Sequence, residues 1–392
     1  MAKFSERFFC PAPWDTIYHH INSSSPCHLI KNPEVMSPLT YLKSGWLKQI
    51  KQDFVDNKVP STCVLCKQRE DQGLKSTRGA IWKYSGFGVE TSLDISKYTV
   101  ETEKSITRIE VRFSNLCNFK CRMCGDHSSS EIAKENQSRV IPLSFELSGR
   151  IIENSIYKAP DSDIEEIKQL CLGKDLFMLC FTGGEPLLIK EYYDLLDFMI
   201  ENNKTDILIE LFTNCSVYNP KFIDRLSKFT KINFVMSIDG VEKTAEYQRH
   251  GTKWDVVRSN IVKFNSLPFT IYFNTTITGY VLLDVSSLAK FLMELYEQNK
   301  NIKTKCYSVP FNNKLHHRFL TLNLRKAALT EIDKAVEILT PKNFQILTTE
   351  LKKIKYYLIT TAPDTGGKFK HITDDLDNIR NESFEDTFNL KF

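Results

Sequence analysis

The chain has 392 residues, of which 42% are apolar and 26% are charged, and its net charge is +4. These values are those of an ordinary globular protein, and they argue against a nucleic-acid coat, a polybasic membrane anchor and a membrane-spanning helix. The first residues carry no apolar signal-peptide core. We therefore expect a cytoplasmic protein whose eleven cysteines stay reduced, with one large domain and a smaller one.

The first hundred residues are predicted to be irregular, apart from an amphipathic stretch over 41–55. They contain four cysteines, Cys10, Cys27, Cys63 and Cys66, and the last two form a Cys-x2-Cys pair. Four thiolates can hold one closed metal site, and such a site explains how a segment with few periodic apolar runs stays folded. From the spacing alone, zinc competes with an iron–sulfur cluster for this site.

From residue 106 onward, short apolar runs alternate with stretches of helical period. The predicted strands are 106–113, 176–181, 206–212, 232–238, 269–277 and 302–309, and the chief predicted helices are 190–202, 220–229, 254–265 and 285–298. This alternation predicts a parallel sheet built from βα units. Six strands are too few for a closed eight-stranded barrel, so we predict an α/β fold with a partial (β/α)6 barrel.

Three cysteines, Cys117, Cys121 and Cys124, follow the first predicted strand directly. Three thiolates this close can hold three irons of a cubane 4Fe–4S cluster, which leaves the fourth iron open to another ligand. Zinc prefers four ligands drawn from separated pairs, so the spacing favours an iron–sulfur cluster. The loop leaves the carboxyl end of a strand, where βα folds place their active sites.

A long insertion over 125–175, predicted to be helical in part, separates this loop from the second strand. The second strand ends at Gly183-Gly184-Glu185-Pro186. The glycines let the backbone approach a ligand, and Glu185 offers a carboxylate that suits an ammonium group. A plain strand-to-helix turn is the alternative interpretation of this motif.

Short polar residues close the next two strands, namely Asn214 after the third and Ser237 and Asp239 at the fourth. Such side chains can bind a ribose hydroxyl, although each also serves elsewhere as a turn or cap residue. Arg249 follows shortly after, and it can pair with the carboxylate of a small ligand. The remaining cysteines are predicted to be small buried residues: Cys171, Cys180, Cys215 and Cys306.

Together, these motifs resemble the radical S-adenosylmethionine (radical SAM) superfamily over residues 106–309. The cysteine spacing, the glycine turn and the Ser237/Asp239 strand end match its cluster, amino-group and ribose motifs in the expected order. Met123 stands where many members have an aromatic residue, and its side chain can pack on an adenine. The resemblance implies that the glycine turn, the polar strand ends, Arg249 and Met123 bind S-adenosylmethionine beside a 4Fe–4S cluster.

The same resemblance implies an activity. In the family, the amino and carboxylate groups of S-adenosylmethionine chelate the open iron, and one electron releases a 5′-deoxyadenosyl radical that abstracts a hydrogen atom from the substrate. The cofactor carries the difficult chemistry, while the protein positions the reactants and excludes water. An electron donor such as flavodoxin or ferredoxin is the expected partner.

The amino-terminal region resembles the twitch or SPASM-like auxiliary-cluster modules of the same superfamily. The resemblance rests on the Cys-Pro-x-Pro-Trp opening and on Glu70, Gly73, Ser76 and Arg78 after the Cys-x2-Cys pair. It implies an auxiliary 4Fe–4S cluster held by all four amino-terminal cysteines. Because such a cluster has no open iron, we expect electron transfer from it rather than substrate binding.

These observations predict three parts. They are an auxiliary iron–sulfur domain over 1–100, a radical SAM core over 101–310 and a helical carboxy-terminal extension over 311–392, in which 325–360 forms two helices and the end is polar and irregular. A peptide or protein substrate is the first hypothesis, by family analogy alone. The alternatives are oxidation or rearrangement of a small metabolite or sugar and, in another class, a non-catalytic zinc or iron–sulfur binding or sensing protein.

Overall fold

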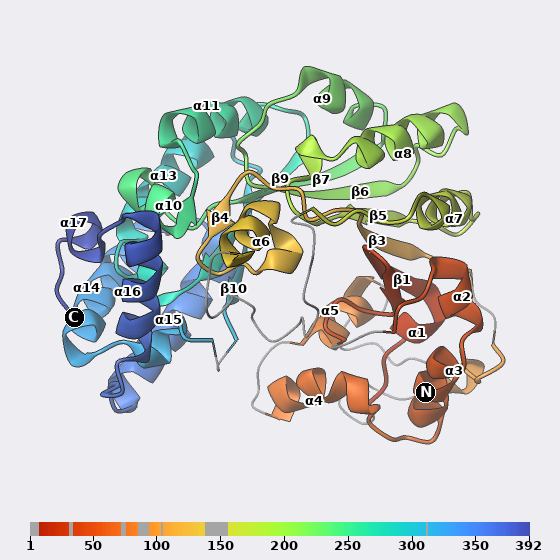
Figure 1. The fold of residues 1–392 in the computed structure, drawn as a ribbon, viewed down its shortest axis with the longest axis horizontal. Helices are drawn as coiled ribbons and strands as arrows, with labels where there is room; N and C mark the ends of the chain where they lie inside the picture. The colour runs from red at the N-terminus through yellow and green to blue at the C-terminus, as the bar shows by residue number, and fades with distance from the viewer. Residues whose placement is uncertain are drawn as a thin grey trace.

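An eight-stranded sheet forms the centre of the computed structural model, which describes residues 8–30, 34–71, 76–84, 94–102, 105–137, 156–310 and 313–392 (Figure 1). The strand order is β10-β9-β7-β6-β5-β3-β1-β2. The strands are β1 Thr16–His20, β2 Ser23–Ser25, β3 Arg108–Arg112, β5 Met178–Phe181, β6 Leu208–Thr213, β7 Lys231–Ser237, β9 Thr270–Ile277 and β10 Lys303–Ser308.

All six predicted strands are confirmed, as β3, β5, β6, β7, β9 and β10, and each pairs in parallel with its neighbours. One row of apolar side chains crosses four of these strands, because Ile109 lies opposite Leu179, Leu179 opposite Ile209, and Ile209 opposite Ile232. All four side chains are buried. Burial on both faces explains why parallel strands read as short, nearly continuous apolar runs.

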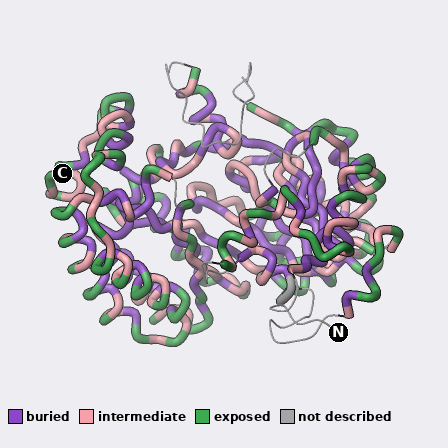
Figure 2. Tube along the Cα trace, turned by 90° about the horizontal axis from the view of Figure 1, so that it is seen from below, coloured by how far each residue is buried: buried purple, intermediate pink, exposed green. Residues whose placement is uncertain are grey.

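Helices between the strands cover the outer side of this sheet and confirm the four predicted ones (Figure 1). They are α7 Asp161–Cys171, α8 Lys190–Glu201, α9 Pro220–Leu226, α11 Trp254–Asn265 and α13 Val285–Gln298. Local signals set their ends: Asn219, for example, caps α9 by accepting a bond from the backbone N–H of Lys221, with Pro220 in the first turn. Figure 2 shows the buried residues gathered in the interior of the molecule and the exposed residues along its periphery.

The prediction of an irregular amino-terminal region is wrong for the residues described there. Strand β1 pairs in parallel with β3, and β2 pairs antiparallel with β1, so this region extends the sheet by two strands. Its helices are α1 Ala12–Asp15, α2 Pro38–Lys43, α3 Gly45–Val55, α4 Val64–Asp71 and α5 Thr77–Tyr84. The sequence signal is weak because β1 is stabilised by its pairing with β3, nearly a hundred residues away, and not by a pattern of its own.

The cysteine loop and the segments around it form a smaller layer. Strand β4 Lys120–Cys121 pairs with β8 Arg249–His250, and the short helices nearby are α6 Ser130–Gln137, α10 Glu242–Gln248 and α12 Gly279–Leu282. The predicted helical content of the 125–175 insertion is confirmed by α6 and α7. Residues 138–155 of the insertion and Gly73 lie outside the described residues.

The carboxy-terminal extension is helical throughout most of its length. The two helices predicted over 325–360 are confirmed as α14 Leu322–Ile338 and α15 Gln345–Thr360. The prediction of a polar, irregular end is wrong, because two more helices follow, α16 Lys368–Arg380 and α17 Phe384–Phe388. Phe369, Ile372 and Leu376 are buried at spacings that place them on one face of α16, in a stripe that is interrupted by charged residues. Among the described residues, no helix is long and apolar enough to cross a bilayer.

The place of β1 in the sheet can be tested by substituting Ile17→Ala. Ile17 is 0% exposed, so the substitution should destabilise the protein by about 2–5 kcal/mol, as buried isoleucine truncations do. The matched control is Ile359→Ala, at 60% exposure, which should change stability by no more than about 0.5 kcal/mol. Equal denaturation midpoints for the two variants would show that β1 is not part of the folded sheet.

Candidate functional site

The three loop cysteines converge at the carboxyl end of β3. Cys117 and Cys121 are buried and Cys124 is half-buried. A hydrogen bond between the thiols of Cys121 and Cys124 lowers the pKa of Cys121 and raises that of Cys124. Burial and the neighbouring Cys121 thiol raise the pKa of Cys117 to about 12. The three sulfurs therefore face one another in a protected position.

The glycine turn is built against the backbone of this loop. Gly183 has a φ of +126°, and a Cβ on Gly184 would lie 2.0 Å from the carbonyl oxygen of Leu116. The N–H of Gly184 donates to the carbonyl of Ser114 (3.2 Å), and that of Glu185 donates to the carbonyl of Leu116 (2.8 Å). The glycines thus allow two backbone segments to touch, which places the turn beside Cys117.

Glu185 is fully buried, and both oxygens of its carboxylate accept hydrogen bonds from neighbouring groups of the protein. One oxygen accepts hydrogen bonds from the Thr213 hydroxyl (2.8 Å) and the Leu187 N–H (3.2 Å), and the other accepts from the Asn214 N–H (2.6 Å). Burial raises the pKa of Glu185 to about 7, although these hydrogen bonds lower it. Glu185 therefore ties the end of β5 to the end of β6. Pro186 begins the 3-10 turn η4 Pro186–Leu188.

The predicted rim residues Asn214, Ser237, Asp239 and Arg249 line one pocket, together with Phe119 of the cysteine loop. The side-chain amide of Asn214 lies 3.8 Å from the Cys117 sulfur. The structure thus brings together residues from the ends of β6 and β7, from β8 and from the cysteine loop, and their roles as ligand-binding residues stay a prediction. Met123 is half-buried and packs against the main core.

Arg249 and Asp239 form a buried ion pair beside the cysteines. The guanidinium donates to the Asp239 carboxylate at 2.6 and 2.7 Å, and another of its nitrogens lies 3.8 Å from the Cys121 sulfur. The other Asp239 oxygen accepts from the Thr276 N–H at 2.7 Å. Burial raises the pKa of Asp239, with Arg249 opposing the shift. Arg249 therefore places positive charge beside the thiolates, whereas the sequence predicted only a partner for a ligand's carboxylate.

The sequence reasoning missed Asn274. It lies opposite Ser237 across the β7–β9 pairing, is buried, and its side-chain oxygen has no hydrogen-bond partner among the described residues. An unpaired buried acceptor is costly, so a polar ligand at this rim would satisfy it. Asn274 therefore adds an unpaired acceptor to the rim formed by Asn214, Ser237 and Asp239, beside the cysteine loop.

A second group of thiols lies in the amino-terminal region. Burial and the nearby Cys63 raise the pKa of Cys10, and burial raises that of Cys63 to about 12. Cys27 and Cys63 pack against the same small apolar cluster as Cys10, and Cys66 also acts electrostatically on Cys10. Among the described residues, no three His, Cys, Asp or Glu side chains are arranged to hold a single metal ion. The assignment of both cysteine groups to clusters stays a prediction.

Arg78, one of the residues that carried the amino-terminal resemblance, supports this group. Its guanidinium pairs with Glu70 (2.5 Å) and donates to the carbonyl of Phe9 (2.9 Å), next to Cys10. Arg78 of α5 thereby joins the segment of Cys10 to Glu70 of α4, the helix that contains Cys66. Of the cysteines predicted to be small buried residues, Cys171, Cys180 and Cys215 are buried, whereas Cys306 is only half-buried.

A family match covers the part of the chain that contains the loop cysteines and the rim residues. Residues 111–292 match the model of the Radical SAM superfamily. The radical SAM cyclopropyl synthase TigE of Paramaledivibacter caminithermalis is 25% identical over 168 residues, which cover 41% of this chain and 33% of that protein.

Two solved structures are similar to this chain at low sequence identity and low TM-score. anSMEcpe with bound AdoMet is 16% identical with a TM-score of 0.42, covering 66% of this chain and 64% of that one. SuiB of Streptococcus suis bound to S-adenosylmethionine is 15% identical with a TM-score of 0.39, covering 79% and 62%. The chain thus matches about a third of TigE and less than two thirds of the other two proteins.

The match over residues 111–292 identifies an enzyme domain rather than a non-catalytic metal-binding module. The chain contains a radical SAM domain, and the family to which this domain belongs uses a 4Fe–4S cluster and S-adenosylmethionine.

The contact between the glycine turn and the cysteine loop can be tested with Gly184→Ala. The added methyl group would meet backbone atoms that cannot rotate away, so we expect a loss of at least about 1–3 kcal/mol in the free energy of unfolding. Gly45→Ala is the control, because nothing lies within 4 Å of a Cβ there. A Gly184→Ala protein as stable as Gly45→Ala would contradict the close approach.

The buried carboxylate of Glu185 predicts a pH dependence of stability. Its pKa is about 7 in the folded protein and about 4.3 in an unfolded chain, so the folded state binds more protons between these values. The contribution of Glu185 to stability should therefore fall as pH rises from about 4 to about 7 and stay level above that. Urea unfolding of metal-free wild type and Glu185→Gln should show this difference, and parallel pH curves would contradict it.

Proposed function

We propose that this enzyme cleaves S-adenosylmethionine reductively and removes a hydrogen atom from a peptide or protein substrate. The observation that carries the proposal is the convergence of Asn214, Ser237, Asp239 and Arg249 on one small pocket beside the Cys117–Cys124 loop. A cluster held by three thiolates would keep one iron open. A ligand bound by these residues would lie beside the cysteines.

The residues around the pocket have distinct tasks in this proposal. Cys117, Cys121 and Cys124 would hold the cluster, and Met123 would pack on the adenine. The Arg249 guanidinium, 3.8 Å from the Cys121 sulfur, stabilises negative charge on the thiolates. Asn274 offers its unpaired oxygen to a hydroxyl or amino group of the ligand.

The glycine turn and the rim complete the binding of the ligand. In the proposal, the backbone of Gly183–Pro186 meets the methionine amino group of S-adenosylmethionine, while Ser237 and Asp239 meet the ribose hydroxyls. Glu185 is a positioning residue, because its buried carboxylate holds the ends of β5 and β6 at a fixed spacing. A reduced 4Fe–4S cluster held by the three cysteines would supply the single electron needed to cleave S-adenosylmethionine, while the residues of the turn and the rim bind and orient that ligand.

The amino-terminal cysteines support a peptide or protein substrate by analogy with auxiliary-cluster modules. In the proposal, Cys10, Cys27, Cys63 and Cys66 hold a second, closed 4Fe–4S cluster that transfers electrons. The electrostatic interaction of Cys10 with the other three thiols supports one shared site. The hydrogen bond from Arg78 to the Phe9 carbonyl, next to Cys10, supports it as well. A flavodoxin or ferredoxin would supply the electrons.

The activity is tested by anaerobic reconstitution with iron and sulfide, followed by addition of reductant and S-adenosylmethionine. Wild type should release 5′-deoxyadenosine, and Cys117→Ala should release on the order of 100-fold less or lower, since even outer-shell metal partners contribute 10–100-fold. Cys171→Ala, a buried cysteine of α7, is the matched control and should retain the activity. Failure of wild type to form 5′-deoxyadenosine would overturn the proposal.

The second cluster is tested by counting iron and sulfide. Two 4Fe–4S clusters give about eight of each per chain, and one gives about four. Substituting both Cys63 and Cys66 with alanine should lower the count from about eight to about four. A wild-type count of about four that these substitutions do not change would show that the amino-terminal cysteines hold no iron–sulfur cluster.

A further inference from the structure

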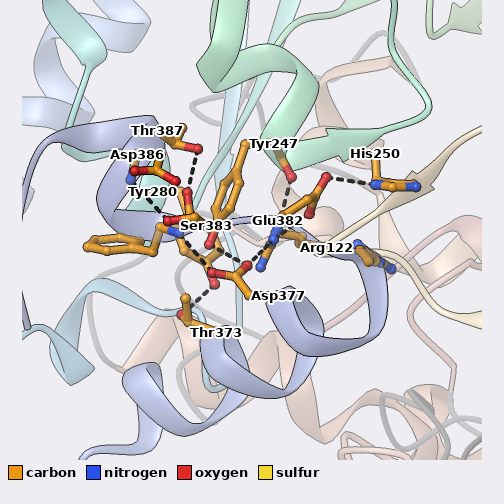
Figure 3. A network of polar contacts seen from close by, with 12 residues as sticks. Arg122, Tyr247, His250, Tyr280, Thr373, Asp377, Glu382, Ser383, Asp386 and Thr387 are labelled. Carbon is orange, nitrogen blue, oxygen red and sulfur yellow. Dashed lines mark hydrogen bonds and ion pairs between the residues drawn. The ribbon is translucent and has the colours of Figure 1, made fainter.

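The carboxy-terminal end of α16 reaches back to the cysteine loop. Arg122 lies between two of the loop cysteines, and its side chain is completely buried. Its guanidinium pairs with Asp377 (2.5 Å) and Glu382 (2.5 Å) and lies 3.5 Å from the ring centre of Tyr247 (Figure 3). Its Nε also donates to the Tyr247 carbonyl at 2.9 Å. A charge at the centre of the loop is thus neutralised by residues more than 250 positions away.

The same acids hold the strand that pairs with the loop. Glu382 lies 2.6 Å from the Nδ1 of His250 through its other oxygen (Figure 3). His250 belongs to β8 and faces Lys120 of β4. Burial would raise the pKa of Glu382, but His250 and Arg122 lower it, so this carboxylate is ionised. Glu382 therefore connects both strands of the β4–β8 pair.

A second ion pair links the same segment, through Glu135, to Lys120, the residue directly before Cys121. Arg380 donates to both oxygens of the buried Glu135 at 3.0 and 3.2 Å. Glu135 also pairs with Lys120 at 2.8 Å. The segment is thus linked to the residues immediately before and after Cys121.

The shape of the segment prepares the acids for these contacts. Asn381 ends α16 in the left-handed region (φ 52°), which turns the chain so that the Glu382 N–H donates to the Asp377 carbonyl. Asp377 accepts from the Phe384 N–H (2.8 Å) and the Tyr247 hydroxyl (2.8 Å). The two carboxylates are therefore held in place by groups other than Arg122.

Such an arrangement has a consequence for the cysteines. A buried ion pair adds little net stability, but losing its partners leaves an uncompensated charge that must find water. Because Arg122 is completely buried, the loss of both partners would favour a shift of its loop, and that loop carries Cys121 and Cys124. Metal ligands need to be held within a fraction of an ångström by their surroundings.

We propose that residues 377–382, which we call the carboxy-terminal clamp, are a positioning element for the cysteine loop. Asp377 and Glu382 act through Arg122, and Arg380 acts through Glu135 and Lys120, to keep Cys121 and Cys124 in the arrangement that binds the cluster. This inference rests on the proposed function of these cysteines as cluster ligands, but its test does not require S-adenosylmethionine cleavage.

The test measures how fast each cysteine of the full-length, metal-free protein reacts with an alkylating reagent, read by peptide mass spectrometry. The double variant Asp377→Asn/Glu382→Gln keeps the side-chain shapes and removes the charges. Cys121 and Cys124 should react faster by on the order of tenfold or more, because the loop opens to solvate Arg122. Cys171 and Cys180 are fully buried elsewhere and should keep their wild-type rates. Unchanged rates at Cys121 and Cys124 would overturn the clamp.

Asp374→Asn is the matched control on the same helix. Asp374 pairs with Lys370 at the surface, so its loss should leave the thiol rates at their wild-type values. In reconstituted protein, the acid double variant should also lose the iron of the loop cluster to a chelator faster than the control. Equal effects of Asp374→Asn and the double variant would show that general charge, and not the clamp, governs the loop.

A cycle with Arg122→Gln separates positioning from global unfolding. If the acids act through Arg122, adding Asp377→Asn and Glu382→Gln to Arg122→Gln should change the thiol rates less than twofold, because no unpaired charge then remains. A further tenfold increase in that background would overturn the clamp, even if the double variant itself unfolds. Absence of 5′-deoxyadenosine formation alone would overturn the proposed function and leave this result standing.

Discussion

The site depends on one backbone contact, between the glycine turn after β5 and the loop after β3. The carbonyls of Ser114 and Leu116 accept hydrogen bonds from Gly184 and Glu185, and the chains approach so closely that no Cβ fits at Gly184. This contact fixes the start of the cysteine loop against the sheet. The buried carboxylate of Glu185 adds hydrogen bonds to the end of β6. The ends of β3, β5 and β6 and the cysteine loop are therefore linked to one another.

Buried charges then surround the cysteines on two sides. Arg249 of β8 lies beside the Cys121 sulfur and is balanced by Asp239, while Arg122 is balanced by the acids of the clamp. Each guanidinium is desolvated and so requires a carboxylate partner. Because the two arginines lie on paired segments, the loop is held between the barrel rim and the carboxy-terminal helices.

The parallel strands and the rim could be predicted from the sequence because their signals are local. Buried strands read as apolar runs, and Asn214, Ser237 and Asp239 close such runs at one edge of the sheet. The strand β1 could not be predicted, since its stability comes from pairing with β3. The helix α16 was missed because its apolar stripe is interrupted by charges, and those charges include Asp377 and Arg380, whose partners lie elsewhere in the chain.

The sequence by itself determined the class of chemistry. The spacing of Cys117, Cys121 and Cys124 and the order of the later motifs can be read from the chain alone, because ligand spacing within one loop does not depend on distant segments. Only the tertiary structure decided what holds that loop. Contacts between distant segments give Arg122 its acidic partners and supply the hydrogen bonds to the Glu185 carboxylate. They also leave the side-chain oxygen of Asn274 unpaired among the described residues. Burial makes each of these groups require a partner, and a linear pattern does not show which groups become buried together.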